Sequence, residues 1–304
     1  MQRFLSFFFL LCSVALCTAA ENSNALVLPR TVEQLPAFKT EEISNKFRIV
    51  TYHYEITASR LEDGIRAGER LEHLFDAWTL LVAEFMTDPR IEKVSGQPAL
   101  RVVLYRDKEE YILNLLRIDS SIAKTNGYYS APRRTAYFFS PDSKVLLHEG
   151  THQILAEYFF RDKKPAFRNN DWVVEGIALL METLKVEEKC YKIGNILDDR
   201  LYAAKVYQFE RNYMMPIRKL TAMSAEEVQA SAEETIKIYS QSAALVHWLM
   251  FAEEGCYRKH LFETLRRTYL DTATPETVSE LTGLSFEELD KKYVEFLNTI
   301  PDEP

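Results

Sequence analysis

The chain has 304 residues, of which 47% are hydrophobic and 27% charged, so it is long and apolar enough to bury a sizeable core. Its 45 acidic residues outnumber its 37 lysines and arginines, and the net charge of −8 argues against nucleic acid as a partner. It contains no internal repeat, low-complexity tract or long Gly/Ser linker, so we expect one compact unit rather than a string of domains.

Residues 1–20 are typical of a secretory signal peptide. Arg3 supplies a positive start, an uncharged apolar stretch follows as far as Leu16, and small residues up to Ala20 offer a cleavage site. The apolar stretch is shorter than the roughly 20 residues of a membrane-spanning helix, and no later segment is long enough. We therefore expect a secreted or periplasmic protein of the cell envelope. Without Arg3 the mature chain would have 36 lysines and arginines against 45 acidic residues, a net charge of −9.

Two of the four cysteines lie in the predicted signal peptide, and Cys190 and Cys256 remain. In an oxidising compartment these two could form a disulfide. The sequence does not say whether they approach each other, and their isolated spacing argues against a zinc role for them.

The first part of the mature chain predicts a small sheet with helices packed on one side, over about residues 46–140. A polar lead precedes it at residues 21–45. We expect an exposed edge strand at Arg134–Phe139, preceded by the turn of a hairpin at residues 127–129. The other predicted elements are a strand at Phe47–Thr57, a long amphipathic helix at Leu61–Met86, a strand at Ala99–Tyr105 and a helix at Lys108–Leu116.

Residues 148–152 read HEGTH, an HExxH motif. On a helix, residues four apart lie on one face, so His148 and His152 can both bind one metal ion. Glu149 is rotated by about 100° from His148 and would lie beside the metal, where it can act as general base toward a water activated by zinc. Ser140 followed by Pro141 predicts the start of this helix, and the apolar residues around the motif predict its burial.

Catalytic zinc sites usually have three protein ligands, so a third must come from elsewhere in the chain. Glu175, 23 residues after His152, is the predicted ligand, on a helix that begins near Trp172 and is capped by one of residues 169–171. Asp171 is the alternative ligand. Gly150 and Gly176 predict close approach of the two helices to their neighbours. Glu182 lies on the same helix face as Glu175 and is expected either to hydrogen-bond a ligating imidazole or to be solvated.

Everything after Ser140 is expected to be helical. The predicted helices cover residues 196–209, 225–230, 235–251, 258–269, 275–281 and 286–298. Ser285 and Glu288 form a capping box at the start of the last one.

HExxH followed by W-x-x-E-G-x-A at Trp172–Ala178 resembles the gluzincin zinc metallopeptidases of the peptidase-MA-like group. The stretch Tyr239–Leu249, which begins Y-S-Q-S, is similar to a helix of secreted bacterial members recorded only as a domain of unknown function. The resemblance spans most of residues 47–297. It implies an α+β, thermolysin-like fold in one catalytic domain at residues 46–300, with a sheet lobe over about 46–140 and a mainly helical lobe over about 141–300.

The resemblance also implies a function, the hydrolysis of peptide bonds at a zinc ion. His148, His152 and Glu175 would bind Zn2+, Glu149 would be the general base, and the strand before the HExxH helix would align an extended peptide or protein substrate, a role for which an exposed edge strand is suited. Tyr239 and His247 are the candidates for stabilising the oxyanion, although a Tyr or His on an apolar helix is more often part of the core.

Two other functions are compatible with the sequence. One is an inactive, gluzincin-like envelope protein that binds a protein or glycan partner, against which the intact Glu149 argues. The other is hydrolysis of an amide other than a peptide bond, such as a cell-wall crosslink. The pattern of residues does not separate these possibilities, nor does it predict an oligomeric state.

Overall fold

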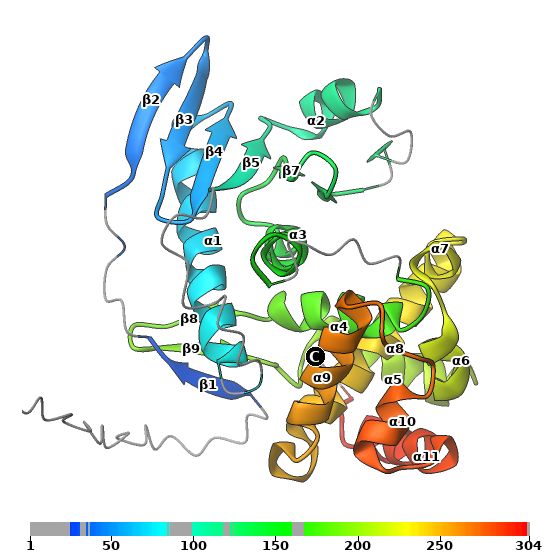
Figure 1. Ribbon diagram of the computed structural model, residues 1–304. Helices are drawn as coiled ribbons and strands as arrows, with labels where there is room; N and C mark the ends of the chain where they lie inside the picture. Colours follow the sequence, from blue (N-terminus) through cyan, green and yellow to red (C-terminus); the bar gives the residue numbers. More distant parts are fainter. Residues whose placement is uncertain are drawn as a thin grey trace, which may run out of the picture.

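A computed structural model of the chain describes residues 25–30, 35, 37–83, 85, 99–117, 122–123, 125–159 and 167–302. The predicted signal peptide, residues 1–20, lies outside these ranges. The fold is α+β, as expected: a mixed sheet and its helices form the first half, and a mainly helical part follows (Figure 1). Within the described residues, no helix combines the length and hydropathy needed to cross a membrane.

The main sheet has six strands in the order β2-β3-β4-β5-β7-β6. The pairs β4/β5 and β5/β7 are parallel and the others antiparallel, so the sheet is mixed. Its strands are β2 (Lys39–Ile43), β3 (Lys46–Val50), β4 (Tyr54–Ala58), β5 (Leu100–Leu104), β6 (Tyr128–Ser130) and β7 (Thr135–Phe138).

Two predictions about this sheet were wrong in detail. The single strand expected at Phe47–Thr57 is a hairpin of β3 and β4, because the chain turns at residues 51–53 and Ile49 then pairs with Ile56. The strand expected to be the exposed edge is β7, which is paired on both sides and buried along its whole length. The edge next to it is β6, which was expected to be part of the turn.

A second, three-stranded sheet corrects two further expectations. It consists of β1 (Leu26–Pro29), β9 (Cys190–Ile193) and β8 (Lys185–Val186), all antiparallel. The segment at residues 21–45 is therefore not only a polar lead, and the chain after Ser140 is not all helical. Leu26 pairs with Ile193, and a contact so remote along the chain leaves no local pattern in either segment.

Most helices lie close to their predicted positions, but α6 was not predicted. The capping box of Ser285 and Glu288 is present at the start of α11. The helices are α1 (Leu61–Val82), α2 (Lys108–Leu115), α3 (Lys144–Ile154), α4 (Asp171–Met181), α5 (Asp199–Phe209), α6 (Ile217–Ala222), α7 (Ala225–Val228), α8 (Ala232–Phe251), α9 (Arg258–Tyr269), α10 (Thr277–Thr282) and α11 (Phe286–Leu297), with a π-helical turn, η3 (Leu155–Phe159), directly after α3.

Helix α3 lies between the six-stranded sheet and the helices of the second half (Figure 1). One side of it packs on α1, where a Cβ on Gly150 would come within 2.8 Å of Leu74 Cδ2. Helix α4 packs equally tightly on α8, since a Cβ on Gly176 would lie 2.8 Å from the carbonyl oxygen of Ser242. The close approach predicted from these two glycines is confirmed, and it brings the HExxH helix and the Glu175 helix into one core.

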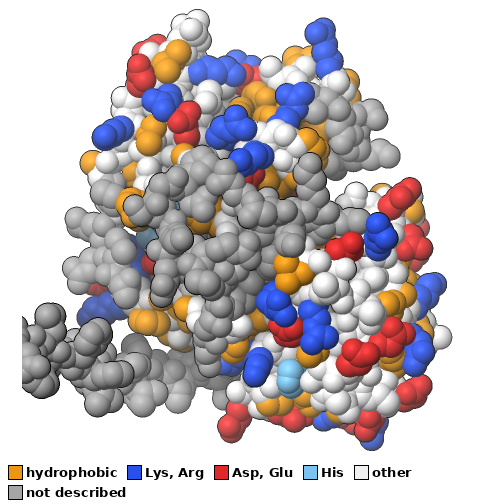
Figure 2. All heavy atoms as spheres, in the orientation of Figure 1, with side chains coloured by type: hydrophobic (Ala, Val, Ile, Leu, Met, Phe, Trp, Pro, Cys, Tyr) orange, Lys and Arg blue, Asp and Glu red, His pale blue; other side chains and the backbone are white. Residues whose placement is uncertain are grey.

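Charged side chains of both signs are interspersed over the face of the molecule drawn in Figure 2, where the described atoms form no continuous field of one sign. This agrees with the moderate net charge of the sequence.

Candidate metal centre

Helix α3 begins three residues later than expected. Its N-cap is Ser143, whose hydroxyl accepts a hydrogen bond from the Val145 amide at 3.1 Å. The preceding residues are held in a non-helical conformation because the Arg70 guanidinium of α1 donates to the carbonyl oxygens of Pro141, at 2.5 Å, and Ser143, at 3.1 Å. The start fixes the helix so that His148 and His152 lie one above the other on the face toward α4.

Helix α4 begins at Asp171, close to the predicted position. Asn170 is at the N-cap in the left-handed conformation, with φ of 57°, but its side chain does not cap the helix. Instead it accepts a hydrogen bond from Trp172 Nε1 at 3.0 Å and donates to the Thr274 carbonyl at 2.8 Å. Glu175 follows one turn later and is only 8% exposed.

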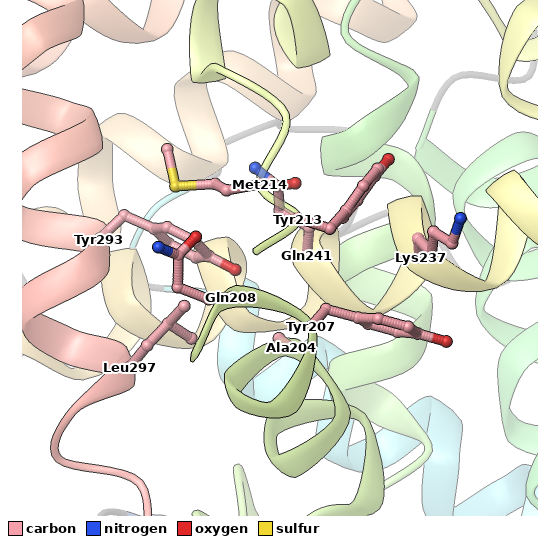
Figure 3. Close-up of a pocket in the computed structure, with 9 residues that line it drawn as sticks. All are labelled: Ala204, Tyr207, Gln208, Tyr213, Met214, Lys237, Gln241, Tyr293 and Leu297. Carbon is pink, nitrogen blue, oxygen red and sulfur yellow. The ribbon is translucent and has the colours of Figure 1, made fainter. Parts of the chain in front are cut away.

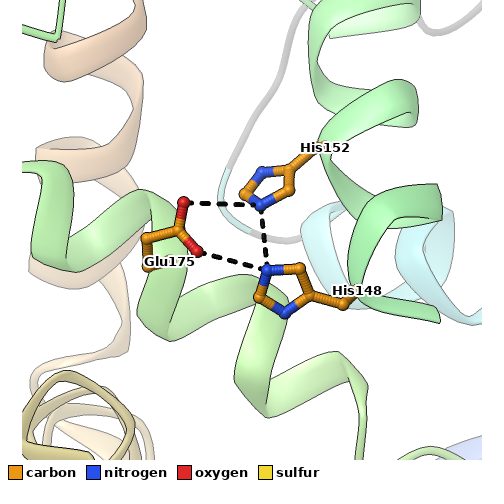
Figure 4. Close-up of side chains that lie close together, drawn as sticks. All are labelled: His148, His152 and Glu175. Carbon is orange, nitrogen blue, oxygen red and sulfur yellow. Dashed lines mark hydrogen bonds and ion pairs between the residues drawn. The ribbon is translucent and has the colours of Figure 1, made fainter. Parts of the chain in front are cut away.

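The side chains of His148, His152 and Glu175 converge (Figure 4). The Nε2 atoms of the two histidines are 3.2 Å apart. Glu175 Oε2 lies 3.2 Å from Nε2 of His148, and its other oxygen lies 3.6 Å from Nε2 of His152. Two imidazoles from one helix thus meet a carboxylate from another. The three residues form a buried group that could hold a metal ion, and we refer to them as the metal group.

These distances fit a tetrahedral metal site. Bonds of about 2.0–2.1 Å from zinc to His nitrogen and carboxylate oxygen place neighbouring ligand atoms about 3.3 Å apart. Two distances, from Nε2 of His148 to Nε2 of His152 and to Glu175 Oε2, are both 3.2 Å and close to that value. Glu175 approaches His152 with its other oxygen, at 3.6 Å, and one ligand atom from each residue lies within 4.8 Å of the others. Two ring nitrogens that face each other at 3.2 Å cannot both be hydrogen-bond acceptors without a proton or a cation between them. A nitrogen and oxygen donor set of this kind suits zinc and similar divalent ions.

The electrostatics of the group favour a positive charge at its centre. Burial lowers the pKa of His148, but hydrogen bonds to Glu175 and Glu182 outweigh it and raise the pKa to about 10. Burial likewise raises the pKa of Glu175, and the charges and hydrogen bonds of the two histidines reverse this and hold the pKa well below its usual range. A buried carboxylate that stays ionised needs such compensation, which a metal cation also provides.

Glu182 lies behind His148. Its carboxylate is 2.8 Å from Nδ1, the ring nitrogen that faces away from the metal position. Because an ionised carboxylate only accepts, Nδ1 donates its proton, so that in the neutral ring Nε2 is the nitrogen with a lone pair for a metal. Of the two expectations for Glu182, the structure favours the hydrogen bond to an imidazole over a solvated side chain.

Glu149, the predicted general base, is held by the edge strand of the sheet. Its Oε2 accepts a hydrogen bond from the backbone amide of Tyr129 in β6 at 3.0 Å. The strand can come this close because residue 127 is glycine: a Cβ there would lie 2.6 Å from Val145 Cγ1 and 3.4 Å from Glu149 Cγ. The edge strand therefore contacts the residue directly after His148.

Of the two residues expected to stabilise an oxyanion, the structure brings only Tyr239 to this group. Its ring is stacked on that of His148, with 6.4 Å between centroids, and its hydroxyl is hydrogen-bonded to Glu175. Burial and the neighbouring charges of Glu175 and Asp171 raise the pKa of Tyr239, so the phenol keeps its proton.

His247 lies elsewhere on the same helix. It is 2% exposed, its ring is stacked on Phe296 and tilted against Phe251, and its Nε2 faces the Gly194 carbonyl oxygen at 3.4 Å. Burial lowers the pKa of His247 to about 4. The eight-residue spacing suggested that both side chains could face one cleft, but His247 occupies the interface with α11 and with the end of β9, as a core histidine does.

Asp171, the alternative third ligand, lies one turn before Glu175 and is 2% exposed. Its Oδ2 has no hydrogen-bond partner among the described residues. Burial and the charge of Glu175 raise the pKa of Asp171 well above its usual value. It is not one of the converging residues.

Three residues at this site were not predicted. They are Tyr129, whose amide contacts Glu149, and the pair Arg134 and Glu157, which join the hairpin of β6 and β7 to the end of the HExxH helix. Backbone contacts such as that of Tyr129 leave no signal in a sequence. Glu157 offered a weak one, since an acidic residue in an apolar helical segment needs a partner.

Two small recesses lie among the helices of the second half and do not contain the metal group. One, of about 190 Å³, is lined by residues of α5, α8 and α11 (Figure 3). Lys237 lies at its edge, where it is paired with Glu233 and Glu234. The other, of about 220 Å³, includes His247. The remaining cysteines, Cys190 and Cys256, do not form a disulfide with each other.

Residues 143–271 match the family model described as a protein of unknown function (DUF1570). This region begins at the N-cap of α3 and includes the metal group and Tyr239. No curated protein matches the chain.

Proposed function

We propose that this protein is an exported zinc metallopeptidase of the gluzincin type, which hydrolyses peptide bonds with Glu149 as general base. The observation that carries the proposal is the geometry of His148, His152 and Glu175, each of which offers a ligand atom within 4.8 Å of the other two. Nε2 of His148 lies 3.2 Å from both Nε2 of His152 and Glu175 Oε2. A carboxylate that is not one of the three ligands, Glu149, follows directly after His148.

The surrounding contacts support a catalytic rather than a structural metal site. A structural zinc site has four protein ligands, whereas three protein ligands leave a position for water or substrate. Among the described residues the group that could hold a metal contains three. Glu182 orients one ligand from behind, as outer partners do in catalytic sites.

In the proposed mechanism, His148, His152 and Glu175 hold the ion. Zinc bound there would polarise a water molecule and the carbonyl of the substrate. Glu149 accepts a proton from the attacking water and passes it to the leaving amine. The Tyr129 amide donates to one oxygen of Glu149, which leaves the other oxygen to take the proton.

Tyr239 is the proposed donor to the oxyanion. Its hydroxyl lies at Glu175 and its phenol is protonated at neutral pH, so it can donate a hydrogen bond to the negative charge that develops on the substrate carbonyl oxygen. Peptides are the proposed substrates because β6, an edge strand of the sheet, lies against Glu149, and an extended chain can pair with an edge strand.

The test is metal content of the purified mature protein and of its Glu149→Gln variant, with both assayed on an unbiased peptide library. We expect one zinc per chain in each and cleavage only by the parent. The variants His148→Ala and His152→Ala should lose zinc and activity together. Cleavage by the Gln variant would refute the mechanism, and zinc without cleavage in the parent would favour the binding function instead.

A further inference from the structure

A buried carboxylate outside the metal group joins the edge strand to the HExxH helix. Glu157 lies in η3, directly after α3, and is 6% exposed. Its Oε1 accepts a hydrogen bond from the hydroxyl of Tyr129 at 2.9 Å, and its Oε2 pairs with the guanidinium of Arg134, where the Nε atom donates at 2.5 Å. Both partners come from the hairpin of β6 and β7.

We propose that Glu157 is a positioning residue, which holds the β6 edge strand through Tyr129 and Arg134 so that the Tyr129 amide stays on the catalytic base Glu149. The inference rests on the proposed function for its catalytic consequence. The contacts themselves do not depend on it.

The hairpin is attached to the helix at both ends of β6. At the start, Gly127 packs on Val145 and on the Glu149 side chain. At the other end, Glu157 binds the Tyr129 side chain and the turn that Arg134 closes. The backbone amide of Tyr129 lies between these attachments, and it donates outward to Glu149 rather than to β7. β6 is paired with β7 along its length, but loss of the Glu157 attachment would leave it fixed to the HExxH helix at one end only.

Local backbone geometry supports the same role. Arg134 is a non-glycine residue with φ of 51°, an uncommon conformation that needs support from its surroundings. Its ion pair with Glu157 provides this support. Glu157 also lies in a π-helical turn, which contains an additional residue relative to an α-turn and so changes the direction of the side chains that follow. Such turns are frequent at functional sites.

The burial of Glu157 requires these partners. A buried carboxylate without hydrogen bonds is costly, and here both oxygens are occupied by donors from the hairpin. Removal of the charge therefore affects the attachment of the hairpin and not the metal ligands, none of which Glu157 contacts in the described structure.

The test uses Glu157→Gln, with Glu72→Gln as the matched control. Glu72 is also a buried carboxylate, 4% exposed, and its hydrogen bonds to Thr51 and His53 lie outside the site. We expect Glu157→Gln to keep zinc and to lower kcat by on the order of 10- to 100-fold, because a small misplacement of a catalytic group has effects of this size. Glu72→Gln should keep the parent kcat. Equal kcat in the two variants would overturn the catalytic consequence.

Hydrogen exchange at the Tyr129 amide tests the positioning role without depending on peptidase activity. We expect this amide to be protected in the parent and to exchange at least about tenfold faster in Glu157→Gln, but not in Glu72→Gln. Tyr129→Phe, which removes only the hydroxyl, should show the same direction of change. Unchanged exchange in Glu157→Gln would overturn the positioning role. If the parent has no peptidase activity, the proposed function is contradicted. The hydrogen-exchange result then still tests whether Glu157 positions the Tyr129 amide.

Discussion

The Glu182 carboxylate lies 2.8 Å from Nδ1 of His148, on the side of the ring opposite the metal position. The same relationship occurs a second time in this protein, between Glu72 and Nδ1 of His53 at 2.7 Å, and neither residue belongs to the group of possible metal ligands found among the described residues. Variants of the two pairs can therefore be compared. Both lose a buried His–Glu hydrogen bond, but only the variant at Glu182 affects a possible metal ligand.

Glu182→Gln should lower zinc affinity by about 10- to 100-fold, since the carboxylate orients His148 and makes its ring a better ligand. Titration of the metal-free protein with zinc against a competing chelator measures this. Glu72→Gln is the control, and it should leave zinc affinity unchanged. Equal zinc affinity in the Glu182 variant and the parent would contradict the role.

Glu175→Ala should weaken zinc binding by more than the roughly 10- to 100-fold typical of an outer partner, because it removes a ligand. Asp171→Asn should have a smaller effect, since Asp171 is not among the converging side chains. Removal of zinc by a chelator should lower the melting temperature of the parent more than that of Glu175→Ala. The reverse order of the two variants would make Asp171 the third ligand.

Tyr239→Phe should lower kcat by about 100- to 1,000-fold, as loss of one oxyanion donor does, and should leave zinc content unchanged. His247→Gln should keep the parent kcat, because His247 packs between Phe251 and Phe296. Steady-state kinetics of both variants at saturating zinc distinguish the two residues. A large loss in the His247 variant alone would reverse the assignment.

The burial of His247 should make the folded protein less stable as the pH is lowered. Its pKa is lowered to about 4 in the folded protein, below an unfolded value of about 6.5, so the unfolded chain binds a proton that the folded one excludes. The group therefore destabilises the fold as pH falls below about 6.5, until the folded protein is also protonated near pH 4. Between pH 7 and pH 5 the parent should lose about 2 kcal/mol more than His247→Gln. Urea unfolding at the two pH values measures this, and parallel curves for parent and variant would contradict it.

Gly176→Ala should destabilise the fold by about 1–3 kcal/mol, because its Cβ would press on backbone of α8 that cannot move aside. The distance to the Ser242 carbonyl oxygen would be 2.8 Å. Gly150→Ala should cost less, since its Cβ would meet only the side-chain ends of Leu71 and Leu74. The free energies of unfolding of the two variants test this order. A larger decrease in Gly150→Ala than in Gly176→Ala would contradict the prediction.

The sequence predicted the α+β class and most helices because amphipathic periodicity and capping residues act within one segment. It also predicted the converging ligands, since the spacing of His148 and His152 puts both on one helix face and Gly176 marks the neighbouring close contact. The helix start at Ser140 was wrong because Arg70, remote in sequence, holds the preceding carbonyls.

By itself, then, the sequence determined the local elements and the pair of imidazoles on one helix face, because these depend on residues a few positions apart. Only the tertiary structure decided that β6 rather than β7 is the edge strand, that β1 pairs with β9, and that Tyr239 rather than His247 lies at the metal group. It also brought Glu157 to Tyr129 and Arg134. These relationships depend on strand register and helix packing between segments far apart in the chain, which no local pattern of residues encodes.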